Sequence, residues 1–570
     1  MFEDYPIWAQ GLAHKYLSKT VNQFILHGNI RDLTLWKHED QVEFMRLKTF
    51  LSEELFGARD IVLFYDRSSG IQFRDKESRI DFNRAVSGYD SLVGTEYAQK
   101  LPKDPVRVFS LLESYFNIRI SENKSIACII DFSETIVPAS EGGMANAEDR
   151  TALVYLQRWA HDPVFLAADF SLVMLTENLN DLNKSLIQSP YNTEIRIDLP
   201  DEEQRMGYIE HYMPKEDYEK ACQVPAAVLA RHTAGLSYIN LQSLLANAVE
   251  NKQVITFDRL IRNKKELIEA EAYGLLEFVD ARHSLDDVAG NHQVKKHLRE
   301  AAAALKSGRN DVMPMGYLIC GSVGTGKSWL VTCFSGEVGV PMVKLKNFRS
   351  QWQGVTEGNL EKILNLLKAM APVAVMIDEA DAYLGDRQMS GDSGVSNRVF
   401  AQIAQFMSNT ENRGRVIWFL MTARPDLMPV DLKRQGRAEE HLALFHPTTD
   451  EERLELFEAM RHKTGIKLVD SYVPEVIRKG TKPLSGADME AALTRAKFKA
   501  AASGTEEVTP EILDRVLADF IPPTYPDEIE LQTLCAVLEC TSRDLLPEAY
   551  RKMDRAEISR IVEKLKTKVR

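Results

Sequence analysis

Gly321-Ser322-Val323-Gly324-Thr325-Gly326-Lys327-Ser328 matches the pattern G-x-x-x-x-G-K-[ST] at every position. In such a loop the glycines allow a tight turn that aims backbone N–H groups at phosphates. The lysine reaches the β- and γ-phosphates, and the hydroxyl can ligate Mg²⁺. Gly316–Cys320 predicts a short buried strand before the loop, and Trp329 continues into a helix whose N-terminus faces the anion. The segment therefore predicts an α/β nucleotide-binding protein in which residues 321–329 bind ATP.

A second motif lies downstream, where the apolar strand Val373–Ile377 ends in Asp378 and Glu379. Alone, this segment would be a buried strand followed by a solvated acidic turn. After a phosphate loop it has the form of a Walker B motif, in which Asp378 holds Mg²⁺ together with Ser328. Glu379 then orients and polarises the attacking water. We expect Lys327, Asp378 and Glu379 to act in Mg-ATP hydrolysis.

The chain from about Leu285 to about Ala501 resembles the AAA ATPases of the protein-remodelling type, such as NSF, katanin and spastin. Asp286-Asp287-Val288-Ala289-Gly290 is similar to the family segment beside the adenine, with Ala289 where a glycine is usual. The resemblance implies that Asp287, Val288 and Gly290 contact the nucleotide.

Two further segments carry the same resemblance. Thr422-Ala423-Arg424-Pro425-Asp426 is similar to the family's sensor segment, with Ala423 in place of the polar Asn. Either Thr422 takes over the contact with the γ-phosphate or water, or the loss slows or retunes hydrolysis. Leu484-Ser485-Gly486-Ala487-Asp488 resembles the start of a helix in the α-helical lid, which implies that Gly486 and Ala487 lie near the nucleotide.

Leu432-Lys433-Arg434-Gln435-Gly436-Arg437 is similar to the segment that supplies arginine fingers in this family. Such arginines reach the nucleotide of a neighbouring subunit, where a guanidinium neutralises charge on the transferred phosphoryl group. The resemblance therefore implies that Arg434 and Arg437 complete the site only in an oligomer, a homo-hexameric ring.

Ser350–Glu357 resembles the first pore loop of the family, in which an aromatic residue grips an extended polypeptide. Trp352, followed by Gly354, offers a large rigid apolar face between polar neighbours. The alternative is a core tryptophan, but the polar neighbours favour exposure. We expect Trp352 and Gly354 to contact a protein substrate in a central pore.

The first 280 residues repeat the order of strand segments seen in the AAA-like part of the chain, but without its phosphate loop and catalytic glutamate. Ile126–Asp131 parallels Val373–Asp378, and Val173–Thr176 parallels Phe419–Thr422. Ile61–Asp66 is expected to be the strand that should enter a phosphate loop, but no G-K-[ST] follows it. Phe132 takes the position of the catalytic Glu379. The first module is expected to be a degenerate AAA domain that serves as a second tier of the ring or as a platform for a substrate or an adaptor.

The predicted fold class is α/β, with tandem P-loop AAA modules built from a parallel sheet, flanking helices and an α-helical lid. The first module lacks the phosphate loop. The predicted boundaries are 1–262 for the degenerate module, 263–284 for a linker, 285–445 for the large α/β subdomain, 446–522 for the lid and 523–570 for a C-terminal helical extension.

Composition limits the remaining functions. A formal net charge of −13 disfavours broad nucleic-acid binding, no apolar run is long enough to span a bilayer, and a cytoplasmic location is expected. No H-E-x-x-H zinc signature is present. The leading prediction is a ring-forming ATPase that remodels proteins. The alternatives are an ATP-regulated assembly scaffold and, less favoured, a nucleic-acid motor or loader.

Overall fold

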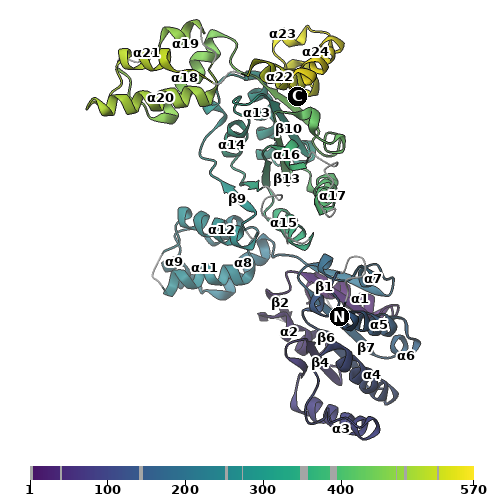
Figure 1. Ribbon diagram of the computed structural model, residues 1–570. Coiled ribbons are helices and arrows are strands. Elements are labelled where there is room, and N and C mark those ends of the chain that lie inside the picture. Colours follow the sequence, from purple (N-terminus) through teal and green to yellow (C-terminus); the bar gives the residue numbers. More distant parts are fainter. Residues whose placement is uncertain are drawn as a thin grey trace. The chain divides into compact units, whose positions relative to one another are not determined.

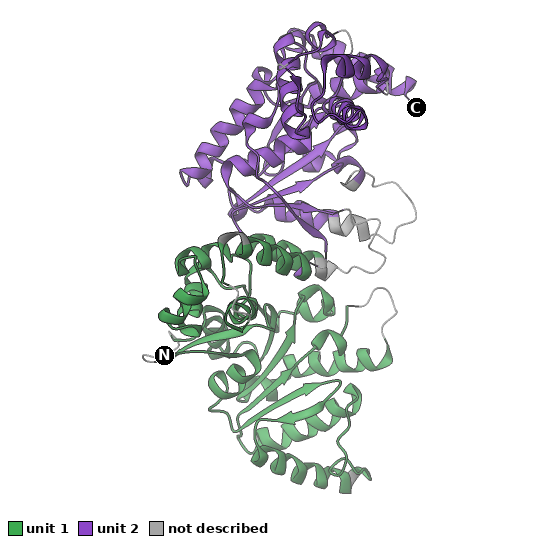
Figure 2. Ribbon diagram, turned by 90° about the vertical axis from the view of Figure 1, so that its left-hand side faces the viewer, with its two compact units in different colours: residues 1–270, 354–369 green, residues 271–353, 370–570 purple. Residues whose placement is uncertain are grey.

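The structure is a computed structural model with two compact units, which Figure 2 shows in different colours. Residues 1–270 with 354–369 form the first unit, and residues 271–353 with 370–570 form the second. Trp352 and Gly354, predicted for the pore loop, lie outside the described residues. The structure describes residues 4–38, 41–139, 146–250, 254–272, 274–346, 357–384, 395–469, 472–480, 484–522 and 525–569.

The first unit contains a six-stranded sheet in the order β5-β4-β6-β7-β1-β8. Five strands run parallel, and β5 pairs antiparallel with β4 at one edge. Along β4, Ile61, Leu63 and Tyr65 join one core cluster while Val62 and Phe64 join the other. The strand is apolar throughout because both faces of the sheet are covered. The strands are β1 (Gln23–Gly28), β4 (Ile61–Asp66), β5 (Gly70–Phe73), β6 (Ile126–Ile130), β7 (Phe170–Thr176) and β8 (Asn192–Ile197).

Helices cover this sheet on both sides. One face packs against α3 (Lys76–Val93), α4 (Pro105–Ser121) and α5 (Ala147–His161), and the other against α1 (Ile7–Leu17) and the π-helix η1 (Phe50–Leu55). The hairpin of β2 (Leu33–His38) and β3 (Gln41–Arg46) and the short α2 (Leu47–Thr49) precede η1. The remaining short elements are η2 (Ser133–Thr135), α6 (Pro163–Ala167), η3 (Leu179–Asp181) and α7 (Lys184–Ile187).

A helical part with its own core follows the sheet in the first unit. Leu229, Leu245 and Leu260 are fully buried in that core. Asp201 caps the first helix through a capping box with Gln204, which satisfies two backbone N–H groups at its start. The helices are α8 (Glu202–Tyr212), α9 (Lys215–Ala221), α10 (Ala226–His232), α11 (Tyr238–Glu250) and α12 (Phe257–Glu271).

The second unit contains a sheet in the order β14-β10-β13-β12-β11-β9, in which all strands except the edge strand β9 are parallel. The carboxyl ends of β10, β12 and β13 therefore meet at one edge, where open α/β sheets bind ligands. The strands are β9 (Leu276–Val279), β10 (Gly316–Gly321), β11 (Met342–Leu345), β12 (Val373–Ile377), β13 (Val416–Thr422) and β14 (Glu440–Leu444). The connecting helices are η4 (Leu285–Asp287), α13 (His292–Lys306), η5 (Asn310–Val312), α14 (Lys327–Val338), α16 (Ala380–Leu384), α17 (Val395–Ser408), η6 (Thr410–Asn412), η7 (Pro425–Leu427) and η8 (Val430–Leu432). Helix α15 (Glu357–Ala369) lies between β11 and β12 in the sequence but belongs to the first unit.

Two groups of helices complete the second unit, and Figure 1 labels them separately. The lid packs around Phe457, Leu493 and Leu513 and contains α18 (Asp450–Thr464), α19 (Glu475–Lys479), α20 (Gly486–Ala502) and α21 (Pro510–Asp519). The C-terminal group contains α22 (Pro526–Glu539), η10 (Arg543–Leu545), α23 (Glu548–Arg551) and α24 (Arg555–Lys568). Residues 263–284, expected to be a linker, include the second half of α12 and the paired strand β9.

The two sheets share one strand order, because β8-β1-β7-β6-β4 corresponds to β14-β10-β13-β12-β11. The predicted role of Ile61–Asp66 is therefore wrong: β1, rather than β4, stands where β10 enters the phosphate loop. The two strands have the same burial along their length, so pattern alone did not separate them. The predicted fold class of parallel sheets with flanking helices and a helical lid is confirmed. Within the described ranges, no helix combines the length and apolar character needed to cross a bilayer.

Candidate nucleotide-binding site

The phosphate loop leaves β10 at Gly321 and enters α14 at Lys327. Gly324 and Gly326 have φ values of +85° and +83°, which L side chains rarely adopt. A Cβ on Gly324 would lie 2.8 Å from the Cβ of Ser485, so the loop packs directly against the start of α20. The structure thus brings Gly486 and Ala487, the first residues of α20, to the phosphate loop.

Ser328 and Asp378 converge from two elements at the carboxyl edge of the sheet. Ser328 Oγ donates a hydrogen bond to Asp378 Oδ2 at 3.0 Å, and Lys344 Nζ lies 3.8 Å from the same oxygen. The N–H of Glu379 donates to Asp378 Oδ1 at 3.0 Å, and Glu379 has a φ of +49°. A left-handed glutamate is strained and is found where surrounding structure imposes it. The adjacent hydroxyl and carboxylate oxygens fit the ligand preference of Mg²⁺.

Lys327 is the first residue of α14 and lies over its own loop. Its Nζ donates to the carbonyl oxygens of Gly321 at 2.8 Å and Ser322 at 3.1 Å. Burial lowers the pKa of Lys327, and the carboxylate of Asp378 opposes that shift by favouring the charged form. The loop therefore holds a cation beside the helix N-terminus, which is itself suited to anions.

Thr422 ends β13 and is 1% exposed. Its Oγ1 donates to Asp381 Oδ1 at 2.7 Å and accepts from the N–H of Arg424 at 2.8 Å. The single hydroxyl proton is therefore used to hold Asp381 at the start of α16. The expected contact of Thr422 with a γ-phosphate or water remains a prediction.

Asp287, Val288 and Gly290 lie beside α14 and the lid. The indole Nε1 of Trp329 donates to the carbonyl of Asp287 at 3.1 Å, and the N–H of Gly290 donates to Glu455 on α18 at 2.9 Å. The Val288 carbonyl accepts from Lys295 at 2.7 Å. These contacts fix the segment by its backbone, whereas the role of its residues in nucleotide binding stays a prediction.

A cavity of about 260 Å³ extends from this segment. Gly290 lines it together with His446 and Thr448, which follow β14, and with Leu545 from the C-terminal group. Burial lowers the pKa of His446, and the positive charge of Lys327 lowers it further. The His446 ring lies beside the phosphate loop, where its Cε1 is 3.5 Å from the position that a Cβ on Gly324 would take.

Three family models match the chain. The model described as "ATPase family associated with various cellular activities (AAA)" matches residues 317–445, which contain the phosphate loop and Asp378. Those described as "AAA+ chaperone, N-terminal Rossmann-like domain" and "AAA+ chaperone, second helical domain" match residues 2–198 and 203–273. The chain belongs to the AAA family. We call residues 317–445 the AAA domain, the whole second unit the AAA module and residues 2–198 the Rossmann-like domain.

Similar proteins come from several branches of this family. The chain is 26% identical to the "Cell division cycle protein 48 homolog" of Archaeoglobus fulgidus over 65% of its own length and 54% of that protein. It is 24% identical to the "Uncharacterized AAA domain-containing protein ycf46" of Guillardia theta, covering 65% of this chain and 71% of that one. Identity to the "ATP-dependent zinc metalloprotease FtsH 1" of Salinibacter ruber is 28% over 45% and 39% of the two chains. The chain thus spans about half the length of the first of these relatives.

The two predicted arginine fingers of the AAA domain lie on a separate surface. Arg434 is exposed, and with Arg437 it lines a hollow of about 800 Å³ against Phe400 and Ala404 of α17. Arg437 donates to Ser408 Oγ at 2.8 Å, and its pKa is lowered by burial and by the charge of Arg434. No phosphate-loop residue lines this hollow. The structure therefore does not bring these arginines to the phosphate loop of their own chain.

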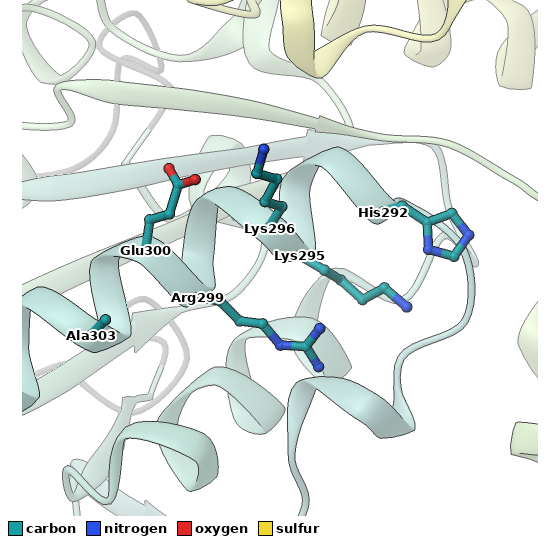
Figure 3. A pocket seen from close by; sticks show the side chains of 6 residues that line it. All are labelled: His292, Lys295, Lys296, Arg299, Glu300 and Ala303. Carbon is teal, nitrogen blue, oxygen red and sulfur yellow. The ribbon is translucent and has the colours of Figure 1, made fainter.

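Another hollow, of about 460 Å³, runs along α13 of the AAA module and is shown in Figure 3. Lys295 and Arg299 point to one side of the helix, and Lys296 and Glu300 to the other (Figure 3). Lys295 donates to the Val288 carbonyl, and Arg299 pairs with Asp286 and Glu337. These two cations hold protein groups in place, so the hollow is a poor candidate for anion binding.

The Rossmann-like domain has a different arrangement at the equivalent edge. His27 pairs with Thr176 as Cys320 pairs with Thr422, so Gly28 of β1 is equivalent to Gly321. The next residues form a short turn into the β2–β3 hairpin, with no helix in the place of α14.

Arg31, in this turn, contacts the acidic residue that is equivalent to Asp378. Its Nη1 donates to both carboxylate oxygens of Asp131 at 2.8 and 3.1 Å, and its Nε lies 3.4 Å from Glu177. The guanidinium also lies 3.9 Å from the ring centre of Phe132. The Arg31 guanidinium therefore stands beside Asp131 at the position where, in the AAA domain, a metal ion could bind to Asp378.

Asp32, the next residue, is 2% exposed, and its carboxylate lies at the N-terminus of α11. Its carboxylate accepts from the N–H groups of Tyr238 at 2.9 Å and Ile239 at 3.0 Å, the first two residues of α11. In the sequence, Leu236-Ser237 before α11 parallels Leu484-Ser485 before α20 of the lid, so we treat the two helices as equivalent. The Asp32 carboxylate thus occupies the N-terminus of α11, a position that suits anions. The corresponding N-terminus in the other unit is formed by Gly486 and Ala487 of α20.

Sequence reasoning missed Arg31 and Asp32, and it also missed Gln532. Gln532 belongs to α22, is 6% exposed, and accepts a hydrogen bond from the N–H of Val323 in the phosphate loop at 3.0 Å. None of the three lies in a motif. A charged Arg-Asp pair after a glycine at a strand end was the available signal for the first two.

Proposed function

We propose that the chain is a cytoplasmic, Mg-ATP-dependent ATPase that forms a homo-hexameric ring and remodels, unfolds or disassembles protein substrates through its central pore. The observation that carries this proposal is the convergence of Ser328 and Asp378, 3.0 Å apart, beside the phosphate loop. Lys327 and Glu379 flank the same edge of the sheet. Membership of the AAA family supports ATPase activity in general.

The residues present fit Mg-ATP. Gly324 leaves a cradle that a Cβ would fill, and the N-terminus of α14 and the Lys327 ammonium are both suited to phosphate. Ser328 and Asp378 would hold Mg²⁺, which supplies charge neutralisation on the phosphates when bound. Glu379 is the group that orients and polarises the attacking water, and Thr422 holds Asp381 in place beside it.

Ring formation is proposed from the position of the arginines. Arg434 and Arg437 lie apart from the phosphate loop of their own chain, as groups that act on a neighbouring subunit would. A guanidinium delivered in trans neutralises charge on the transferred phosphoryl group. The pore contact by Trp352 and Gly354 is proposed from the sequence resemblance. The Rossmann-like domain is proposed as a platform for an adaptor or substrate.

The proposal is tested with Glu379→Gln and the matched control Glu451→Gln, an exposed residue of α18. We expect Glu379→Gln to reduce ATP hydrolysis by roughly 100-fold or more while ATP binding persists, because only water activation is lost. The ATP-bound variant should form hexamers in solution by light scattering. Hydrolysis at the wild-type rate in Glu379→Gln would show that the catalytic assignment is wrong.

An ATP-regulated scaffold is the second candidate, favoured by the Arg31–Asp131 contact that fills the equivalent site of the Rossmann-like domain. Trp352→Ala distinguishes the two. A remodeller should keep ATP hydrolysis but lose unfolding of a model substrate such as a tagged fluorescent protein. A scaffold should lose neither its assembly nor its partner binding.

A further inference from the structure

One face of α22 contacts three loops of the AAA module that the proposed function uses. Gln532 Oε1 accepts from the Val323 N–H at 3.0 Å, and Glu528 lies 3.8 Å from Arg424 in the sensor segment. The C-terminal residue of the helix, Glu539, also belongs to this face. Positions 528, 532 and 539 share it because helical residues four, seven and eleven apart lie above one another.

Glu539 is held at the segment that carries the arginines. Its Oε2 accepts from Lys433 Nζ at 2.9 Å, and Lys433 also donates to the carbonyl of Pro425 at 3.0 Å. On the other side, the Glu539 carboxylate lies 3.2 Å from the buried ring of His441 on β14. Because Lys433 directly precedes Arg434, these contacts set the direction in which the exposed Arg434 leaves the loop.

We propose that α22 is a tether that fixes the phosphate loop and the arginine-bearing loop of one subunit relative to each other. This inference rests on the proposed function. Gln532 is then a positioning residue for nucleotide binding, and Glu539 is a positioning residue for the arginine that acts on the neighbouring subunit. Neither side chain touches the reacting atoms; each acts through Val323 or Lys433.

The Gln532 and Glu539 contacts should affect different measured quantities, the nucleotide Kd and the kcat of hydrolysis. Loss of the Gln532 acceptor frees the third residue of the phosphate loop, so the loop must be ordered when nucleotide binds. That change weakens nucleotide binding in the same subunit. Loss of the Glu539 charge frees Lys433 and Arg434, which lowers the rate in the assembled ring and leaves the subunit's own affinity unchanged.

The experiment compares full-length Gln532→Met, Glu539→Gln and the control Glu530→Gln, an exposed residue on the same helix. Titration with the fluorescent nucleotide mant-ADP gives Kd, and steady-state ATP hydrolysis gives kcat. We expect Gln532→Met to raise Kd roughly threefold to tenfold, the worth of one hydrogen bond. Glu539→Gln should lower kcat by a similar factor at unchanged Kd. Glu530→Gln should change neither.

The split between the two variants separates positioning from a structural role. If α22 only stabilises the fold, both variants change Kd and kcat together in proportion to their loss of Tm, and the tether is overturned. Wild-type Kd in Gln532→Met with wild-type kcat in Glu539→Gln would also overturn it. A wild-type chain that binds no mant-ADP would overturn the proposed function first, and the tether with it.

Discussion

The AAA module and the Rossmann-like domain arrange equivalent strands in the same order, yet their carboxyl edges are used differently. At the AAA edge, Ser328 and Asp378 lie side by side and the loop glycines leave room for phosphate. At the Rossmann-like edge, Arg31 contacts Asp131 and Asp32 occupies the start of α11. In the Rossmann-like domain the Arg31 cation therefore stands where the AAA edge would hold a metal ion, and the Asp32 carboxylate stands where it would hold a phosphate.

Backbone geometry is preserved where the chemistry differs. Phe132 and Glu379, the residues after the acidic strand ends, have φ values of +52° and +49°. In each case the N–H donates to the preceding aspartate. Such a conformation is strained for a bulky L residue, so the turn itself is imposed by the strand edge. The turn after the acidic strand end is therefore kept in the Rossmann-like domain, although Phe132 stands there in place of the proposed catalytic Glu379.

The largest expected effect comes from Lys327→Met, with Lys296→Met on the exposed side of α13 as control. Removing a partly buried cation from a phosphate site removes about 3 kcal/mol or more, roughly 100-fold in affinity. Full-length Lys327→Met should therefore show no tight ADP site by calorimetry. If one ADP per chain still binds with wild-type affinity, the Rossmann-like domain has a nucleotide site and the contrast between the two edges fails.

The second prediction uses acid sensitivity. Burial, together with the charge of Arg196, lowers the pKa of His27 from 6.5 to about 4. The folded state therefore loses stability as pH falls from 6.5 through 4, by about 3 kcal/mol in full. Cys320 is the equivalent residue of the AAA module, and burial raises the pKa of its thiol. It therefore carries no such titration.

Hydrogen exchange in β1 and β10 between pH 7 and pH 4 checks this difference. Protection of β1 should fall with pH more steeply than protection of β10, and His27→Cys should remove the difference. His14→Cys, at an exposed position on α1, serves as the control. Equal acid sensitivity of β1 in wild type and in His27→Cys would contradict the assignment to His27.

Arg31→Ala is expected to have a smaller effect, confined to the Rossmann-like domain. It leaves the carboxylates of Asp131 and Glu177 without their shared cation, at partly exposed positions. A loss of about 1–2 kcal/mol follows, between the values for exposed and buried pairs. Exchange of β6 amides in urea measures it, with the exposed Arg107→Ala as control. Unchanged β6 protection would show that the guanidinium is dispensable, and a changed basal ATPase rate would show that it acts beyond its domain.

Motifs that are contiguous in sequence predicted the AAA site, because the phosphate loop and Asp378 each follow an apolar strand. The family resemblance added Arg434, Arg437 and the lid residues. Contacts between distant residues could not be predicted: Arg31 and Asp131 are 100 residues apart, and Val323 and Gln532 are 209 apart. The order of strands in the first sheet was also hidden, since β1 and β4 are both buried along almost their whole length. A run of buried residues indicates that a segment is a strand, but only its pairing with neighbouring strands shows its place in the sheet.

The smallest expected effect tests the shared turn through Phe132→Gly. Glycine relieves left-handed strain of about 1–2 kcal/mol, but it loses the Arg31–ring contact of about 0.5–1 kcal/mol and adds chain entropy of similar size. Stability should therefore change by less than about 1 kcal/mol by urea unfolding, with ATP hydrolysis unchanged. Glu379→Gly should likewise keep the fold but lose hydrolysis. If Phe132→Gly instead unfolds the Rossmann-like domain, the aromatic ring rather than the strand edge maintains the turn. The two edges would then differ in architecture as well as in chemistry.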